Sequence, residues 1–81
     1  MKYIKLKKYL IKNNILLFDA HYRLIHHRLN IIKQQTGGSI TKKNIKKLSE
    51  YQLYNFIDCV LYNNNHKMNH YIKLFQENIL V

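Results

Sequence analysis

The chain contains no proline, only two glycines and a single cysteine, and each shortage excludes a class of structure. Because proline and glycine interrupt regular elements, their scarcity favours long helices over a loop-rich or many-stranded fold. The single cysteine, Cys59, rules out an internal disulfide framework and is typical of a reducing compartment. No stretch approaches the roughly 20 apolar residues that a membrane span needs. We therefore expect a cytoplasmic or otherwise intracellular protein.

Acidic residues are also scarce: four Asp and Glu stand against 14 Lys and Arg. No two of the four carboxylates share a short motif, and the chain has no glycine-rich phosphate loop, nucleophile signature or dinucleotide fingerprint. The sequence therefore predicts a protein that is not an enzyme and that uses no cofactor and no small-molecule substrate.

Cys59, His66 and His70 have a spacing that invites a test for metal binding. A zinc site usually needs four ligands, and only the distant His21, His26 or His27 could complete this set. A lone cysteine among apolar residues is more often a small core residue. We therefore interpret Cys59 as part of the core and predict no metal site.

The basic residues are unevenly distributed along the chain. Residues 1–48 contain twelve Lys or Arg against one acid, Asp19, whereas residues 49–81 contain two lysines against three acids. Ile, Lys, Asn and Tyr together supply 40 of the 81 residues, which indicates an AT-rich genome such as that of a phage or mobile element. Codon bias accounts for some of the lysine, but it does not account for the asymmetry between a basic half and a near-neutral half.

Residues 1–12 alternate lysine with Tyr, Ile and Leu. This segment lacks the continuous apolar region of a secretory signal, and it lacks the Arg and Ser of a mitochondrial presequence. Residues 3–12 predict a short amphipathic helix, with Tyr3, Leu6 and Leu10 on one side and Lys5, Lys8 and Lys12 on another. Asn13 and Asn14 are expected to end this helix and to cap the next.

A second, longer helix is predicted up to the segment Gln35–Ser39, whose glycines are typical of a helix C-terminus. Its expected buried stripe consists of Phe18, Tyr22, Ile25, Leu29 and Ile32, widened by Leu17, Leu24 and Ile31. Its expected polar side carries Arg23, His26, His27, Asn30 and Lys33.

Three further helices are expected in the rest of the chain. Thr41 can cap a short helix that reaches Leu48, and Ser49 with Gln52 has the spacing of a capping box. The inward residues expected in these helices are Ile45 and Leu48, then Leu53, Phe56, Ile57, Val60 and Leu61, then Met68, Ile72, Phe75 and Ile79. The sequence therefore predicts an all-α protein, a compact bundle of four to five short helices in a single domain spanning residues 1–81.

Four lysines, at positions 42, 43, 46 and 47, form the most concentrated charge in the chain. On a helix, Lys42 with Lys46 and Lys43 with Lys47 are adjacent like charges, and each pair costs about 0.2–0.5 kcal/mol. Cations near a helix N-terminus are also disfavoured. Phosphates would relieve both penalties, so this pattern favours binding to nucleic acid. The alternative interpretation is a solvated surface helix.

The polar sides of the first two helices could extend such a surface. The residues predicted to bind nucleic acid are Lys42, Lys43, Lys46, Lys47, Arg23, His27, Lys33, Lys5, Lys8 and Lys12. A helix-turn-helix interpretation of residues 40–61 is weak, because Leu48 leads directly into Ser49 without the usual turn of three or four residues. The next helix would also present Glu50 and Asp58, which do not suit phosphates or base edges.

The function that the sequence favours is therefore non-enzymatic binding of nucleic acid through a lysine-rich surface, as an accessory or regulatory factor. DNA and RNA are not distinguished. The main alternative is a protein-interaction module, such as a small phage or viral factor that binds a host or defence protein, a homodimer, or a structural subunit of a larger assembly. Such a module would expose an apolar and tyrosine-rich patch, for example on the near-neutral half. A membrane-surface role for residues 1–12 is a weaker third possibility.

Overall fold

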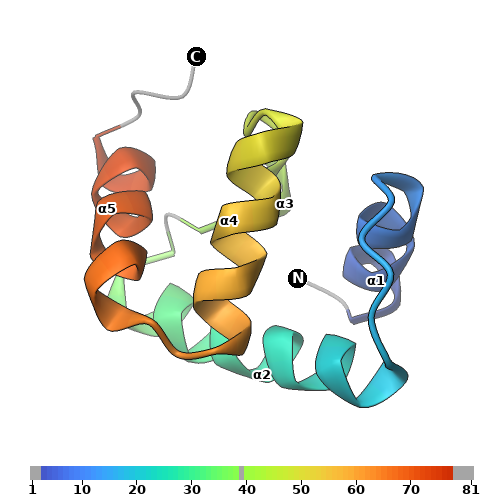
Figure 1. Cartoon of the computed structure of the whole chain (residues 1–81). Helices are drawn as coiled ribbons and strands as arrows, with labels where there is room; N and C mark the ends of the chain where they lie inside the picture. The colour runs from blue at the N-terminus through green and yellow to red at the C-terminus, as the bar shows by residue number, and fades with distance from the viewer. Residues whose placement is uncertain (1–2, 39, 78–81) are drawn as a thin grey trace.

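The protein is built from α-helices (Figure 1). The structure, a computed structural model, describes residues 3–38 and 40–77. Over these ranges it consists of five α-helices and no strand: α1 (Tyr3–Lys12), α2 (Asp19–Gln35), α3 (Lys42–Ile45), α4 (Glu50–Leu61) and α5 (Asn65–Gln76). The predicted all-α bundle is confirmed.

The longest helix, α2, forms a base against which α1 and α4 pack (Figure 1). α1 packs over the N-terminal part of α2, α4 packs against α2 further along, and α5 lies beside α4. The short helix α3 lies behind α4 in the view of Figure 1 and leads the chain from α2 into α4. This arrangement brings α1 and α3, which are about 30 residues apart in the chain, to the same side of the molecule.

Several helix starts follow the expected capping chemistry. The side chain of Thr41 accepts a hydrogen bond from the backbone N–H of Asn44 at 3.2 Å. Ser49 and Gln52 form both halves of a capping box, with hydrogen bonds of 3.2 and 3.0 Å between the side chain of one residue and the backbone N–H of the other. These contacts satisfy N–H groups that the first helical turn leaves without partners. Both predicted caps are confirmed.

The connection between α1 and α2 differs from the prediction. Asn14 has a positive φ of 64° and closes α1, so the predicted break is confirmed. The prediction that an asparagine caps the next helix is wrong, because the N-cap of α2 is Phe18, which makes no side-chain cap hydrogen bond. The physical reason is that Asn14 lies in the left-handed region and the extended segment 15–18 separates it from α2.

The third helix is shorter than predicted, because α3 ends at Ile45 rather than at Leu48. Beyond it, the backbone N–H of Leu48 donates to the carbonyl of Ile45 at 3.1 Å, in a tight turn that brings the chain to Ser49. Ile45 and Leu48 are both buried, as predicted. A four-residue helix has little dipole, so the penalty expected for lysines near a helix N-terminus does not apply to α3.

One hydrophobic core joins all five helices. The predicted inner stripe of α4 is confirmed in full, and Cys59 is buried beside it, as expected of a core residue. Phe56 lies at its centre and contacts Tyr71 and Phe75 edge to face, at centroid distances of 5.5 and 5.3 Å. The core consists of Leu6, Leu10, Ile15, Tyr22, Ile25, Leu29, Ile40, Ile45, Leu48, Leu53, Phe56, Ile57, Cys59, Val60, Leu61, Met68, Tyr71 and Phe75.

The predicted stripe of α2 is too wide. Tyr22, Ile25 and Leu29 are buried, but Phe18 is 79% exposed and Leu24 and Ile31 are also exposed. Phe18 lies outside the helix as its N-cap. Leu24 and Ile31 line a hollow between α2 and the α4–α5 pair instead of packing into the core, and periodicity alone does not reveal this. In α5, Met68 and Phe75 are buried and Ile72 is half-buried, while Ile79 lies outside the described residues.

Arg28 of α2 holds the C-terminal end of α4, a contact that the sequence did not predict. Its Nη1 donates to the carbonyl of Val60 at 2.9 Å and also to the carbonyl of Leu61. A cation at a helix C-terminus pairs with unsatisfied carbonyls and with the negative end of the helix dipole. Arg28 therefore fixes α4 on α2 at the point where the chain turns toward α5.

Candidate nucleic-acid interface

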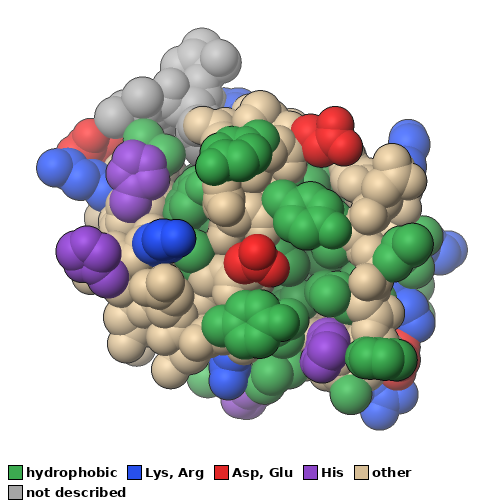
Figure 2. All heavy atoms as spheres, in the orientation of Figure 1, with side chains coloured by type: hydrophobic (Ala, Val, Ile, Leu, Met, Phe, Trp, Pro, Cys, Tyr) green, Lys and Arg blue, Asp and Glu red, His purple; other side chains and the backbone are tan. Residues whose placement is uncertain are grey.

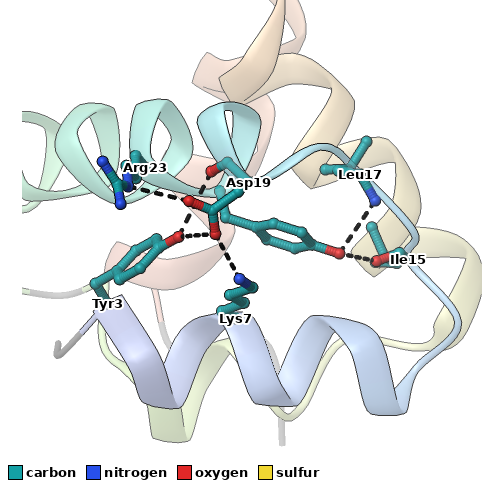
Figure 3. Close-up of polar contacts among 7 residues, drawn as sticks. Tyr3, Lys7, Ile15, Leu17, Asp19 and Arg23 are labelled. Atoms are coloured by element: carbon teal, nitrogen blue, oxygen red, sulfur yellow. Dashed lines mark hydrogen bonds and ion pairs between the residues drawn. The ribbon is translucent and has the colours of Figure 1, made fainter.

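The position of α1 depends first on Tyr22, whose side chain is only 2% exposed. Its hydroxyl donates to the carbonyl of Ile15 and accepts a hydrogen bond from the backbone N–H of Leu17 at 3.1 Å (Figure 3). Both partners belong to the segment that connects α1 with α2. Tyr22 therefore satisfies the polar backbone of this connection and fixes the direction in which α1 returns along α2.

The carboxylate of Asp19, at the start of α2, forms a second anchor for α1 (Figure 3). It accepts hydrogen bonds from the Tyr3 hydroxyl at 2.7 Å and from the Lys7 ammonium, and it forms an ion pair with Arg23 at 3.2 Å. The hydrogen bonds from Lys7 and Tyr3 hold the pKa of the Asp19 carboxyl below its usual value. Arg23, which the sequence predicted to bind nucleic acid, thus has an intramolecular partner.

The opposite side of α1 presents lysines toward α3. Lys5, Lys8 and Lys12 of α1 line a shallow depression of about 290 Å³ together with Lys42 and Lys46, and Tyr9 lies among them. We call this site the lysine groove and define it by Lys5, Lys8, Tyr9, Lys12, Lys42 and Lys46. Five of the ten predicted binding residues therefore meet at one place, although they come from segments far apart in the sequence.

The positive charge of the lysine groove has no internal counter-charge in the described part of the chain. None of its five lysines forms an ion pair with a described carboxylate, in contrast to Lys7 and Arg23. Partial burial, together with the positive charges of Lys46 and Lys5, lowers the pKa of Lys42. An anion in the groove would oppose the electrostatic part of this shift.

Tyr9 is the aromatic member of the lysine groove, and the list of predicted binding residues did not include it. The Lys46 ammonium lies over its ring at 5.9 Å from the centroid, and burial raises the pKa of its hydroxyl. Its position could have been predicted, because Tyr9 is four residues from Lys5 and three from Lys12 and therefore shares their side of the helix.

The other predicted residues do not line the groove. Lys43 and Lys47 are exposed nearby in the sequence but are not among its lining residues. Lys33 lines a separate hollow near Gly37 and Gly38, at the C-terminal end of α2. His27 lines a third hollow, described below. Lys42 and Lys46 therefore meet the lysines of α1, whereas Arg23, His27 and Lys33 lie outside the lysine groove.

That third hollow, of about 770 Å³, lies between α2 and the α4–α5 pair. Its lining is mostly apolar and amide side chains. Its two basic residues are His27 and Arg28, and the Arg28 guanidinium is already bonded to carbonyls of α4. The hollow is therefore larger than the lysine groove but has less unpaired charge available for a ligand.

A different kind of surface covers the outer side of α4. Tyr51 and Tyr62 are 77% and 75% exposed, and Tyr54 between them is also exposed. Figure 2 shows hydrophobic side chains gathered over α4 with acidic side chains among them, while Lys and Arg lie mainly at the margins of this view. We call this surface the tyrosine face and define it by Tyr51, Tyr54 and Tyr62 together with the exposed acids Glu50 and Asp58.

Two further sequence predictions concern metal and membrane. Among residues 3–38 and 40–77, no three His, Cys, Asp or Glu side chains lie close enough to hold one metal ion. Burial raises the pKa of the Cys59 thiol, which keeps it in its less reactive protonated form. No helix in the described ranges is both long enough and apolar enough to cross a membrane.

Comparison of the chain with protein-family models, with curated proteins and with solved structures finds no match.

Proposed function

We propose that the protein binds nucleic acid without catalysis, through the lysine groove between α1 and α3. The observation that carries this proposal is the meeting of five lysines from two helices around one depression, with no described carboxylate paired to any of them. A folded protein usually neutralises or disperses such charge, because adjacent cations repel one another. A polyanion would supply the missing counter-charge.

The phosphate backbone is the chemistry that fits this groove. Lysine ammonium groups bind phosphates as point charges, and each contact releases a counterion from the nucleic acid. Binding would also remove the repulsion that Lys46 and Lys5 exert on Lys42. The lining contains no Asn, Gln or Arg, and its lysines are compact point charges on flexible stems, which suit phosphates better than the fixed geometry of base edges. We therefore propose binding that depends little on sequence.

The test is a titration of a fluorescent oligonucleotide at 50 and 200 mM salt, comparing the wild type with Lys42/Lys46→Gln. The matched control is Lys67/Lys73→Gln, which removes the same charge from α5. If all five lysines contact phosphates, the log–log salt slope of the wild type is about −3.5 on single strands and about −4.5 on duplex.

We expect Lys42/Lys46→Gln to reduce both the affinity and the salt slope, while the control stays close to the wild type. Equal losses in both variants would mean that only net charge matters, and the lysine groove would not be the binding site. No association of the wild type with any polynucleotide at 50 mM salt would refute the function itself.

A second candidate function, protein binding, is favoured by the tyrosine face. Tyrosines are enriched at protein interfaces, and two of these are more than 70% exposed. The acids Glu50 and Asp58 in the same face disfavour contact with phosphates there. Sedimentation of the wild type and of Tyr51/Tyr62→Ser tests self-association. A monomeric wild type would exclude a homodimer through this face.

A further inference from the structure

We infer that the lysine groove binds single-stranded rather than duplex nucleic acid, with one base stacked on Tyr9. This inference rests on the proposed function and adds the class of nucleic acid. It follows from three features of the groove, namely its two walls, its small size and the aromatic ring in its lining.

The first feature is that lysines approach from two helices. Lys5, Lys8 and Lys12 come from α1, whereas Lys42 and Lys46 come from α3 and its C-terminal end. The α1 lysines extend over about 10 Å at 1.5 Å per residue, enough to follow successive phosphates of one strand. A single backbone lying between the walls would contact ammonium groups on both of its sides.

The second feature is the size of the groove. A depression of about 290 Å³ has the volume of roughly ten water molecules. A strand with an unpaired base can enter such a space. A duplex is convex and keeps its bases inside, so its phosphates would contact only the rims and would leave Tyr9 without a partner.

The third feature is Tyr9 itself. Proteins that bind single strands without sequence preference combine a basic groove with aromatic side chains on which bases stack. In the free protein, the Lys46 ammonium occupies the position over the Tyr9 ring, at 5.9 Å from its centroid. When a strand binds, Lys46 moves from the ring to a phosphate, and a base takes its place on the ring. Lys46 thus exchanges a weak contact for a charged one.

An anionic membrane surface is the competing ligand, because α1 also exposes Ile4 and Ile11. Helices that bind membrane surfaces insert an apolar face beside their basic residues. Here the apolar pair is not among the lining residues, and the lysines of α1 instead share a concave site with α3. A concave site suits a strand better than a flat bilayer, so we commit to the polynucleotide and use vesicles as a test.

The experiment uses the complete chain carrying Tyr9→Trp. The sequence contains no other tryptophan, so its fluorescence reports on the groove alone. The probes are a 20-nucleotide dT strand, a 20-base-pair duplex of mixed sequence, and phosphatidylserine–phosphatidylcholine vesicles, each at 150 mM salt. We expect the single strand to quench the fluorescence and to bind at least tenfold more tightly than the duplex.

Ring-retaining and ring-removing variants separate stacking from charge. Tyr9→Leu is expected to lose at least about fivefold in affinity for the dT strand, because stacking on an aromatic ring is lost. It should lose less than twofold for duplex. Tyr9→Phe keeps the ring and should bind like the wild type, and Tyr54→Leu, on the tyrosine face, is the matched control. Circular dichroism and urea unfolding show whether each variant is folded.

The outcomes distinguish the two proposals. Equal or tighter binding of the duplex, or equal losses for Tyr9→Leu on both nucleic acids, would overturn the single-strand inference and leave nucleic-acid binding intact. Tighter binding to vesicles than to either nucleic acid would overturn both. If Tyr9→Leu does not fold, an unquenched Tyr9→Trp that still binds the strand would overturn the stacking contact.

Discussion

The lysine groove and the tyrosine face are both exposed, but they differ in the charged side chains that they contain. The groove collects five lysines without a described carboxylate partner, whereas the tyrosine face mixes aromatic rings with Glu50 and Asp58. Neither arrangement is needed for folding, because the groove lysines and the residues of the tyrosine face lie outside the core. Under the proposed functions, the groove would bind a polyanion and the tyrosine face a protein.

The two regions are also attached to the fold in different ways. α4 lies in the centre of the core, where Phe56 packs against two aromatic rings of α5 and Arg28 holds the last carbonyls of the helix. α1 lies at one end of α2 and depends on Tyr22 and Asp19 for its direction. One wall of the groove is therefore held by these polar contacts in addition to the buried Leu6 and Leu10.

The largest effect is expected when all five groove lysines are changed to glutamine. Each lysine–phosphate contact contributes about 0.7 to the salt slope on a single strand, and at about 0.1 M salt this corresponds to roughly fivefold in affinity. Losing five such contacts should therefore weaken binding by about three orders of magnitude. The measurement is the dissociation constant for a single strand. Tyr51/Tyr54/Tyr62→Ser should stay within twofold of the wild type. A larger loss in the tyrosine variant than in the lysine variant would reverse the assignment of the two surfaces.

Arg28→Leu is expected to lower the free energy of unfolding by about 1.5–3 kcal/mol. Two carbonyls at the end of α4 lose a charged hydrogen-bond donor, and a hydrogen bond to a charged group contributes about that much. Urea unfolding measures the loss. Because Arg28 is not among the residues that line the groove, the folded variant should bind a single strand like the wild type. An unchanged urea midpoint would mean that the contact contributes nothing.

Tyr22→Phe is expected to cost about 1–3 kcal/mol of stability, because the Ile15 carbonyl and the Leu17 N–H both lose a partner in a buried place. Unlike Arg28→Leu, this change should also weaken nucleic-acid binding by a few fold, since it loosens the α1 wall. In Tyr22→Phe, amide hydrogen exchange should accelerate more in α1 than in α4. A larger acceleration in α4 would contradict the proposed role of Tyr22 in holding α1.

The smallest expected effect is the contribution of His26 to the pH dependence of stability. Its Nε2 lies 3.2 Å from the side-chain nitrogen of Asn30, its ring meets Tyr3 edge on, and its Nδ1 is buried with no hydrogen-bond partner in residues 3–38 and 40–77. Partial burial, with nearby positive charge, lowers the pKa of His26 below 6.5.

The unfolded chain therefore binds a proton more readily than the folded one, so stability is greatest above about pH 6.5 and falls as the pH drops through the folded pKa. The melting temperature should decrease from pH 7.5 to 5.5, and His26→Gln should reduce this decrease. The matched control His66→Gln, at an exposed position on α5, should leave the pH dependence as in the wild type.

Much of the fold followed from local signals in the sequence. The bounds of α1, the Thr41 cap and the capping box at Ser49 are decided within a few residues, and periodicity found the whole inner stripe of α4 because both α2 and α5 pack on it. Periodicity could not distinguish the buried from the exposed apolar residues of α2. Leu24 and Ile31 have the right character for burial, but they line the hollow between α2 and the α4–α5 pair and stay partly exposed.

The site was predictable in its parts and not in its assembly. Charge density pointed to Lys42 and Lys46, and helical spacing grouped Lys5, Lys8 and Lys12. Their meeting depends on the long-range packing of α1 and α3, which local patterns do not encode. For the same reason Arg23 resembled the other cations in the sequence, although in the fold it forms an ion pair with Asp19.

The carboxylate of Asp19 has a consequence beyond the docking of α1. As the only acid in residues 1–48, it pairs with Lys7 of α1 and Arg23 of α2, whereas no lysine of the groove pairs with a described carboxylate. Under the proposed function, removing this carboxylate would leave Lys7 and Arg23 as two further unpaired cations between α1 and α2, and these would compete with the groove for a polyanion.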